Sequence, residues 1–185
     1  MKKQIISLLI IIFSLISFHT HASEQNWKPA QDGDKIILIR HAKAPGGGDP
    51  EGFKIEDCKT QRNLDIMGIN QAKKIGKLFT EKKVKIDKVL SSQWCRCKDT
   101  AKYAFGDFKE FSALNSTYTP PYDQNEKQQI KELKKYVSSW KGNGGNLVLV
   151  THYVIILAIT GETTRSGELV ITDKNFNILS KIKTL

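Results

Sequence analysis

Hydrophobic and polar positions alternate along the chain with two different periods. Short apolar runs typical of strands are separated by longer amphipathic stretches with helical spacing. The predicted strands are Lys35–Ile39, Lys88–Ser91, Phe108–Leu114, Asn146–Thr151, Glu168–Thr172 and Phe176–Lys183. The predicted helices are Ile66–Lys82, Gln93–Phe105, Asn125–Trp140 and Tyr153–Thr160. This order predicts an α/β fold, a three-layer sandwich in which a mostly parallel central sheet carries helices on both faces and ends in a hairpin at the turn TDKN.

The first 22 residues have a different pattern from the rest of the chain. Lys2 and Lys3 precede the apolar run IISLLIIIFSLISF, and the small-residue ending Thr20-His21-Ala22 follows it. This is the order of a cleavable secretory signal peptide. A retained membrane anchor is the disfavoured alternative, because the apolar core is shorter than the ~20 residues that a span needs. We expect cleavage near Ala22, no stable membrane insertion afterwards, and one domain over residues 23–185 that is periplasmic or secreted.

The chain is basic. Its formal net charge is +10, and +8 remains when the leader with its two lysines is removed. Such an excess favours anionic partners. The lysines are scattered along the predicted helices without an aromatic-interleaved patch, so nucleic-acid binding is not expected. The expected partner is a phosphorylated small molecule or envelope component, and the protein is expected to be a monomer or a homodimer.

Polar side chains follow three of the predicted strands. They are Arg40-His41 after the first strand, Ser91-Ser92 and Arg96 after the second, and Thr151-His152 after the fourth. Ligands of open parallel sheets bind beyond the carboxyl ends of the strands, so these groups would converge. A neutral imidazole is a nucleophile toward phosphorus, and fixed guanidinium groups bind phosphoryl oxygens. The cluster therefore predicts a phosphate site in which the second histidine, protonated, adds a donor; neither a metal nor a cofactor is expected.

Four segments carry a resemblance to a known family. LIRHA, QRNLDIMGINQAKKIG, LSSQWCRCKDTA and LVLVTH stand in this order and together resemble the motifs of the histidine phosphatase superfamily, which includes phosphoglycerate mutases and acid phosphatases. The resemblance spans nearly all of the chain after the leader and implies a phosphoglycerate mutase-like fold. The segments APGGGDPEGF, CKTQRNL and SGE are more similar to a subgroup of small exported bacterial members.

The resemblance implies a phosphomonoester hydrolase of the bacterial envelope. The alternative is a catalytically weak phosphate-ester binding protein of the periplasm. A mutase of phosphorylated sugars or glycerates is less favoured, because an exported enzyme would rarely meet those metabolites.

The resemblance also implies roles for individual residues. His41 would be the nucleophile that forms a phosphohistidine. The implied phosphate pocket consists of Arg40, Arg96 and His152. The candidate substrate contacts are Arg62, Asn63 and Gly48, with a solvated loop arginine as the alternative for Arg62. The glycines at 46–48 are interpreted as a mobile lid, in preference to a set of anion-binding amides.

The proton donor departs from the family pattern. Members with strong phosphatase activity carry a Glu after the third strand or an Asp directly after the second catalytic histidine, where this chain has Leu114-Asn115 and Tyr153. The remaining candidates are Glu168 as first choice, then Asp49, Glu51, Asp57 and Asp123. The alternative for Glu168 is that it only begins an exposed strand. Without a carboxylate, the enzyme would be limited to good leaving groups, as in phosphohistidine, acyl phosphates or aryl phosphates, or it would bind phosphate esters without turnover.

Three cysteines are an odd set for an exported chain. Cys97 stands where relatives often carry a small buried alanine, so we expect it to pack inertly. We predict a disulfide between Cys58 and Cys95 that ties the loop of Arg62 to the helix of Arg96. A zinc site is the rival interpretation, disfavoured by the Cys-x-Cys spacing and by the lack of a fourth ligand outside the active site.

Overall fold

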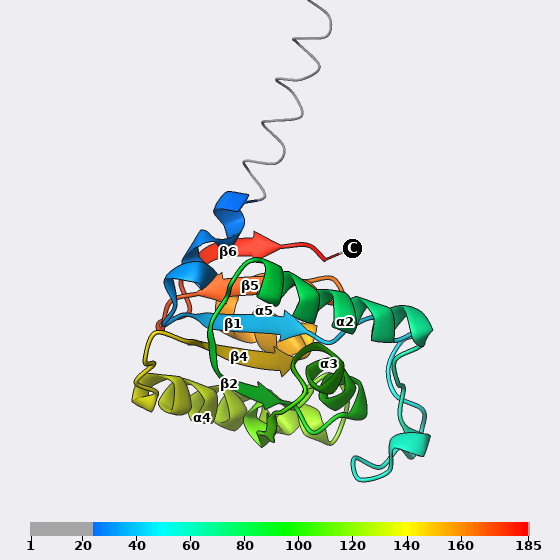
Figure 1. Cartoon of the computed structure of the whole chain (residues 1–185). Coiled ribbons are helices and arrows are strands. Elements are labelled where there is room, and N and C mark those ends of the chain that lie inside the picture. Colours follow the sequence, from blue (N-terminus) through cyan, green and yellow to red (C-terminus); the bar gives the residue numbers. More distant parts are fainter. Residues whose placement is uncertain (1–23, 185) are drawn as a thin grey trace, which may run out of the picture.

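The structure is a computed structural model that describes residues 24–184 (Figure 1); the predicted signal peptide and its cleavage site near Ala22 lie outside these residues. A six-stranded sheet has the order β3-β2-β4-β1-β5-β6. Its strands are β1 (Ile36–Arg40), β2 (Ile86–Ser91), β3 (Lys109–Glu110), β4 (Asn146–Thr151), β5 (Leu169–Thr172) and β6 (Ile178–Ile182). The first four strands run parallel, whereas β5 is antiparallel to β1 and to β6. The predicted mostly parallel sheet and its final hairpin are therefore confirmed.

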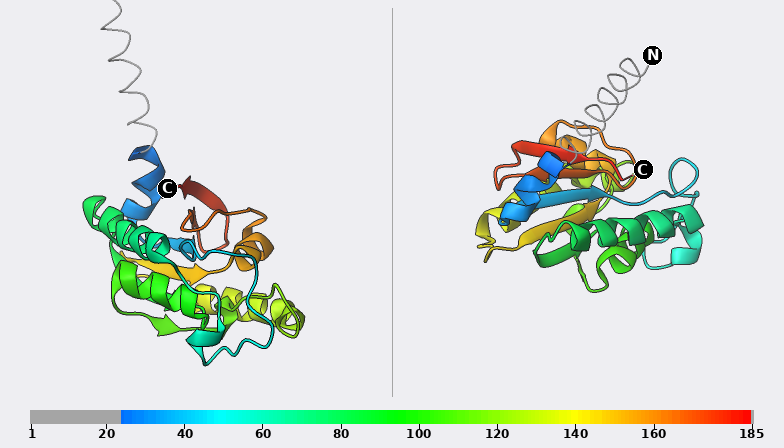
Figure 2. Two further views of the ribbon diagram at one scale, coloured as in Figure 1. Left: turned by 90° about the vertical axis from the view of Figure 1, so that its right-hand side faces the viewer. Right: turned by 45° about the horizontal axis from the view of Figure 1, so that its top comes forward.

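Helices cover both faces of this sheet and complete three layers (Figures 1 and 2). The regular helices are α2 (Ile66–Glu81), α3 (Cys95–Phe105), α4 (Glu126–Ser139) and α5 (Tyr153–Thr160). The 3-10 turns are η1 (Cys58–Thr60), η2 (Ser112–Leu114) and η3 (Tyr122–Asn125). The helices α2 and α3 lie on one face, and α4 and α5 lie on the other. Within residues 24–184, no helix combines the length and the apolar character needed to cross a membrane.

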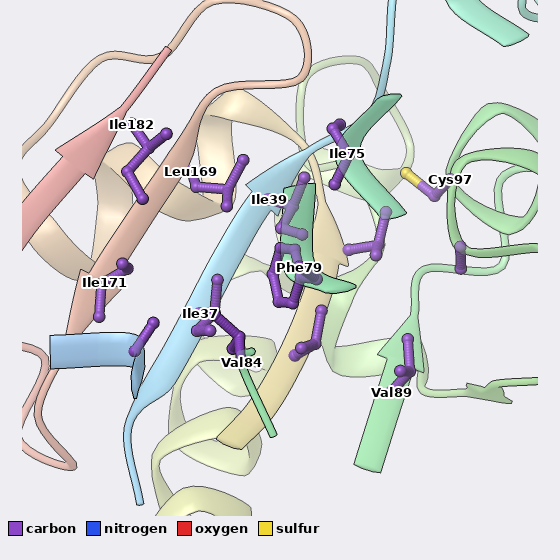
Figure 3. Packing of buried hydrophobic residues seen from close by; sticks show 14 of the residues in the cluster. Ile37, Ile39, Ile75, Phe79, Val84, Val89, Cys97, Leu169, Ile171 and Ile182 are labelled. Carbon is purple, nitrogen blue, oxygen red and sulfur yellow. The ribbon is translucent and has the colours of Figure 1, made fainter. Parts of the chain in front are cut away.

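The central strand β1 shows why its residues form a buried strand. Its side chains alternate between two hydrophobic clusters: Ile37 and Ile39 pack toward α2 and α3, and Ile36 and Leu38 pack toward α4 and α5. Figure 3 shows the first cluster, in which Phe79 lies over β1. All four aliphatic residues of β1 are fully buried, and each contributes about 1.5–3 kcal/mol of hydrophobic stabilisation. This burial on both faces holds the carboxyl end of β1 in a fixed place.

Two elements differ from the sequence prediction. The predicted third strand, Phe108–Leu114, pairs with β2 only at Lys109–Glu110, because Ala113 and Leu114 turn into the core under α4 and form η2 instead. Residues 24–32 form a helix that the hydrophobic pattern did not indicate. It packs on the first hydrophobic cluster through Trp27 and Ala30, with Trp27 edge-on against Phe79 at a centroid distance of 5.6 Å.

Candidate active site

The carboxyl ends of β1, β2 and β4 lie at one edge of the sheet, which the left view of Figure 2 faces. The chain continues from these ends to His41, to Ser92 and α3, and to His152. Together with the loop after His41, they surround a cavity of about 320 Å³. The predicted residues that line it are Arg40, His41, Gly48, Arg62, Arg96 and His152. The convergence of the predicted cations and histidines is therefore present in the structure.

His41 is buried, with 2% of its surface exposed. Its Nδ1 lies 2.8 Å from the carbonyl oxygen of Ala42, and because a carbonyl only accepts, Nδ1 carries the hydrogen. The other ring nitrogen, Nε2, then has a free lone pair. Burial, followed by the positive charge of Arg96, lowers the pKa of His41 well below its usual value. The imidazole is therefore a neutral nucleophile at physiological pH.

His152 has the opposite tautomer. Its Nδ1 lies 3.5 Å from Nη2 of Arg96, which can only donate, and its Nε2 lies 2.9 Å from Oγ of Ser92. The Ser92 hydroxyl in turn donates to Oδ1 of Asn115 at 3.2 Å, so it accepts from Nε2–H. Burial, then Arg96 and His41, lowers the pKa of His152 well below its usual value. The prediction of a protonated second histidine is wrong for this state, because burial and the adjacent charge of Arg96 favour the neutral ring.

Three guanidinium groups face the cavity. Arg40 and Arg62 each donate one Nη1–H to a main-chain carbonyl, at 2.6 and 2.7 Å, and Arg96 donates Nη1–H to Asp49 at 2.8 Å. Each of the three also has a buried Nε–H that lacks a hydrogen-bond partner among residues 24–184. Buried donors without partners are rare in folded proteins. The three guanidinium groups themselves line one cavity, and their positive charges make it an anion site.

Asp49 organises two of these arginines. Its carboxylate accepts from Arg96 Nη1, from Trp94 Nε1 at 3.0 Å and from the main-chain N–H of Arg62 at 3.1 Å. The side chain is only 6% exposed. Three donors on one carboxylate are the arrangement of an ionised group. With three guanidinium groups, one carboxylate and two neutral imidazoles, the site has a formal charge of +2, which matches a phosphoryl dianion.

Glu168, the first-choice proton donor, does not reach the pocket. Its Oε2 accepts from the main-chain N–H of Arg165 at 2.8 Å, and its side chain lines a neighbouring cavity with Lys43 and Lys183. This neighbouring cavity, of about 340 Å³, meets the pocket at Ser166. Glu168 is only 6% exposed, so the alternative of an exposed strand start is also wrong. Glu168 directly precedes β5, and its hydrogen bond with Arg165 holds its side chain against the main chain, outside the lining of the cavity around His41.

The remaining candidates lie outside the pocket lining, except for the glycine loop. Glu51, Asp57 and Asp123 are exposed, and Asp57 caps η1. Asn63 donates its side-chain amide to the carbonyl of Cys58 and does not line the cavity. Gly48 does line it, with φ of 78° and with no atom within 4 Å of the position that a Cβ would occupy. The glycine loop therefore borders the pocket on its open side.

The cysteines have the predicted arrangement. Cys58 and Cys95 form a disulfide with a Cα–Cα distance of 5.7 Å, which joins η1 to the first residue of α3. The side chain of Gln61 adds a second tie by accepting from the main-chain N–H of Cys95 at 3.0 Å. Cys97 is buried with a free thiol, 3.4 Å from Nε2 of His152, and burial raises its pKa to about 12. Within residues 24–184, no group of three or more His, Cys, Asp or Glu side chains is placed to hold a metal ion.

Several residues of the site were missed by the sequence analysis. Asn115, noted only as a departure from the family pattern, orients Ser92 and through it His152. Gln71 on α2 accepts from the main chain of Lys43 and donates to the carbonyl of Ser166, so it ties the chain after His41 to the loop before β5. The signal for Gln71 was its polar side chain on the apolar face of α2.

Comparison with known proteins supports the fold. No protein-family model and no curated protein matches the sequence. A candidate phosphohistidine phosphatase SixA from Agrobacterium tumefaciens matches at 20% identity with a TM-score of 0.56, over 81% of this chain and 98% of that chain. The protein histidine phosphatase SixA complexed with tungstate matches at 13% identity with a TM-score of 0.56, over 81% and 97% of the two chains. Phosphoglycerate mutase from Thermus thermophilus matches at 16% identity with a TM-score of 0.58, over 80% and 98%.

Proposed function

We propose that this chain, which has the phosphoglycerate mutase-like fold of the histidine phosphatases, hydrolyses phosphoryl compounds through a phosphohistidine on His41. The observation that carries the proposal is the set of three guanidinium groups around the same cavity as a neutral buried imidazole. Guanidinium N–H groups match the oxygens of a phosphoryl group in geometry and charge.

The proposed reaction has two steps. In the first, the lone pair of His41 Nε2 forms a bond to phosphorus, and the bond from phosphorus to the leaving group breaks with its electron pair on the leaving group. The hydrogen bond from Nδ1 to Ala42 holds the ring and stabilises the charge that it gains. In the second step, water attacks phosphorus, the bond to Nε2 breaks, and inorganic phosphate is released. The three arginines offset the charge on the phosphoryl oxygens in both steps.

The substrate class follows from the question of which residues in the pocket could donate a proton to the leaving group. Asp49 is the one carboxylate among the lining residues, and it is held by three donors. A poor alkoxide leaving group needs an acid that contributes ~10²–10⁴-fold. We therefore propose substrates whose leaving groups depart without such help: phosphohistidine, acyl phosphates or aryl phosphates. The SixA proteins of similar fold are described as histidine phosphatases, the first of these classes.

The same set of pocket residues favours one second candidate function. A pocket that binds phosphate firmly and lacks a free acid also suits a protein that binds phosphate esters without turning them over. The two candidates differ in one observable, because only the enzyme forms a covalent bond to His41.

We further propose that residues 1–22 direct export to the bacterial envelope and are removed there. The Cys58–Cys95 disulfide supports this location, since such bonds persist in oxidising compartments. The N-terminal residue of the protein recovered from the periplasmic fraction should be Ser23. Recovery of full-length protein from the cytoplasm would contradict the location and leave the chemistry untouched.

The experiment for the function compares the native protein with His41→Asn. Acetyl phosphate, 4-nitrophenyl phosphate and glycerol phosphate are offered in parallel, and the protein is quenched in base to preserve an acid-labile phosphoenzyme. We expect turnover of the first two substrates, a trapped phosphohistidine, and loss of both by about 10³-fold or more in His41→Asn. Turnover retained in His41→Asn would rule out the covalent mechanism. Binding of all three esters with neither turnover nor phosphoenzyme would establish the second candidate.

A further inference from the structure

Tyr118 holds a large aromatic ring at the mouth of the pocket, where it is 56% exposed. The three residues before it are buried, and their loop is fixed: Thr117 donates to the carboxylate of Glu126 at 3.2 Å, and the side chain of Gln129 donates to the carbonyl of Asn115 at 2.9 Å. The loop therefore has a defined position and exposes one aromatic side chain beside the cavity.

The exposed ring belongs to a short series of aromatic and cation–π contacts. The Tyr118 ring meets the Tyr153 ring in a T-shaped contact, with centroids 5.9 Å apart. The Tyr153 ring also carries the guanidinium of Arg40, whose central carbon lies 5.1 Å from the ring centroid. Both tyrosines line the pocket. The series runs from a phosphate-binding cation to the solvent.

We propose that the rings of Tyr118 and Tyr153 form a subsite that binds a flat aromatic leaving group of the substrate. The inference rests on the proposed function and narrows its substrate class to imidazole or phenol leaving groups. In an in-line displacement the leaving group lies on the side of phosphorus away from His41 Nε2. Because His41 is buried and Tyr118 is exposed on the same cavity, this side leads toward the tyrosine. Aromatic rings that meet at offset or edge-to-face angles gain about 0.5–1.5 kcal/mol beyond their burial.

A single exposed aromatic residue on a protein surface needs no functional explanation. Tyr118 differs from that case in three respects: it borders the catalytic cavity, it contacts a second pocket aromatic, and its loop is anchored to α4. An acyl group has no ring to use these contacts, so the subsite separates two leaving groups that both depart without an acid.

The first test measures binding alone, with phenylphosphonate and methylphosphonate, neither of which the enzyme can hydrolyse. Titration calorimetry of the native exported protein should give tighter binding of phenylphosphonate by about 3- to 10-fold. This ratio should fall toward one in Tyr118→Leu and persist in the matched variant Tyr118→Phe, which keeps the ring. An unchanged ratio in Tyr118→Leu would overturn the proposal. So would an equal loss in Tyr118→Phe, because the hydroxyl and not the ring would then be responsible.

The second test measures turnover of 4-nitrophenyl phosphate against acetyl phosphate. In Tyr118→Leu the loss in kcat/KM for the aryl substrate should exceed the loss for the acyl substrate by about 3- to 10-fold, mainly through KM. Equal losses would refute the aromatic subsite while leaving the phosphatase intact. If the proposed function fails instead, neither substrate is hydrolysed, and the phosphonate ratio still reports on the subsite.

Discussion

Two neighbouring cavities at the edge of the sheet have nearly the same volume, about 320 and 340 Å³, and share Ser166. Each contains cationic side chains and one buried carboxylate, Asp49 in the first and Glu168 in the second. The first holds three guanidinium groups, each fixed by a hydrogen bond, and the second holds the ammonium groups of Lys43 and Lys183 together with the guanidinium of Arg165. Positive charge is common to both cavities. The proposed active-site pocket is distinguished by three guanidinium groups that hydrogen bonds hold in place.

The two carboxylates express the same difference. Asp49 accepts from two arginines and a tryptophan and therefore ties the donors of the pocket together. Glu168 accepts from the main chain of Arg165 and closes a local turn. Asp49 therefore positions the charged groups of the pocket, whereas Glu168 stabilises the chain beside the pocket.

The largest effect is expected from a substitution at Asp49, the carboxylate of the first cavity. Asp49→Asn removes the counter-charge of the buried Arg96 and should lower the free energy of unfolding by about 3–5 kcal/mol. Tungstate, an oxyanion, should reduce this loss in the free energy of unfolding, because it supplies negative charge to the same guanidinium groups. Urea unfolding with and without tungstate measures both values.

The matched control for Asp49→Asn is Glu168→Gln. It should cost about 1 kcal/mol, the value of one hydrogen bond, and tungstate should not change that cost. It should also leave the rate ratio of alkyl to aryl phosphates unchanged, because the carboxylate lies outside the pocket. A selective loss on alkyl phosphates would restore Glu168 as the proton donor and contradict the placement described above.

A smaller effect is expected when the loop of the pocket is released from α3. Replacing both Cys58 and Cys95 by serine should lower the free energy of unfolding by about 2–4 kcal/mol. Tungstate affinity should fall as well, because Arg62 and Asp49 lie on the loop that the disulfide holds. Calorimetry before and after a reducing agent is the measurement. Reduction should weaken tungstate binding in the native protein and have no effect on the double variant. Equal affinity in both proteins, before and after reduction, would show that the disulfide does not position the loop.

The smallest effect is expected from pH, which acts on the free energy of unfolding through the two histidines of the first cavity. The pKa values of His41 and His152 are lowered by burial and by Arg96, whereas an unfolded histidine titrates near 6.5. Below that pH the unfolded chain binds more protons, so the free energy of unfolding should fall as the pH drops, by at most about 1.4 kcal/mol per pH unit for each histidine. Above it the contribution is fully present.

Unfolding curves between pH ~7.5 and ~5.5 measure this slope. His41 and His152 are the histidines of residues 24–184, so the double variant to asparagine should have a flatter profile. A profile equal to that of the native protein would mean that carboxylates, and not the imidazoles, set the acid sensitivity.

The sequence predicted the parts of the fold that depend on local pattern. Strand β1 was recognisable because its buried run ends abruptly in Arg40 and His41, and the same holds for β4 before His152. The ends of parallel strands meet at one edge by topology, so the core of the site followed from the order of the elements. These predictions needed no knowledge of how the loops fold.

The rest of the site depends on loop conformation, which periodicity does not encode. Asp49 reaches Arg96 only because the glycine loop folds back over the pocket, and Asn115 reaches Ser92 only because the third strand ends early in η2. Glu168 was favoured from its place in the chain, but its hydrogen bond with the main chain of Arg165 holds its side chain in the other cavity. Each difference arises from the contacts of a single polar side chain.

The burial of Cys97 has a consequence for thiol–disulfide exchange. Exchange requires a thiolate, and with a pKa of about 12 the thiol of Cys97 is ionised in only about one molecule in ten thousand near pH 8. Although it stands two positions from Cys95, Cys97 therefore cannot attack the Cys58–Cys95 bond at a useful rate in the folded protein. Scrambled isomers can form only before the core closes, so an isomerase would act on this chain during folding and not afterwards.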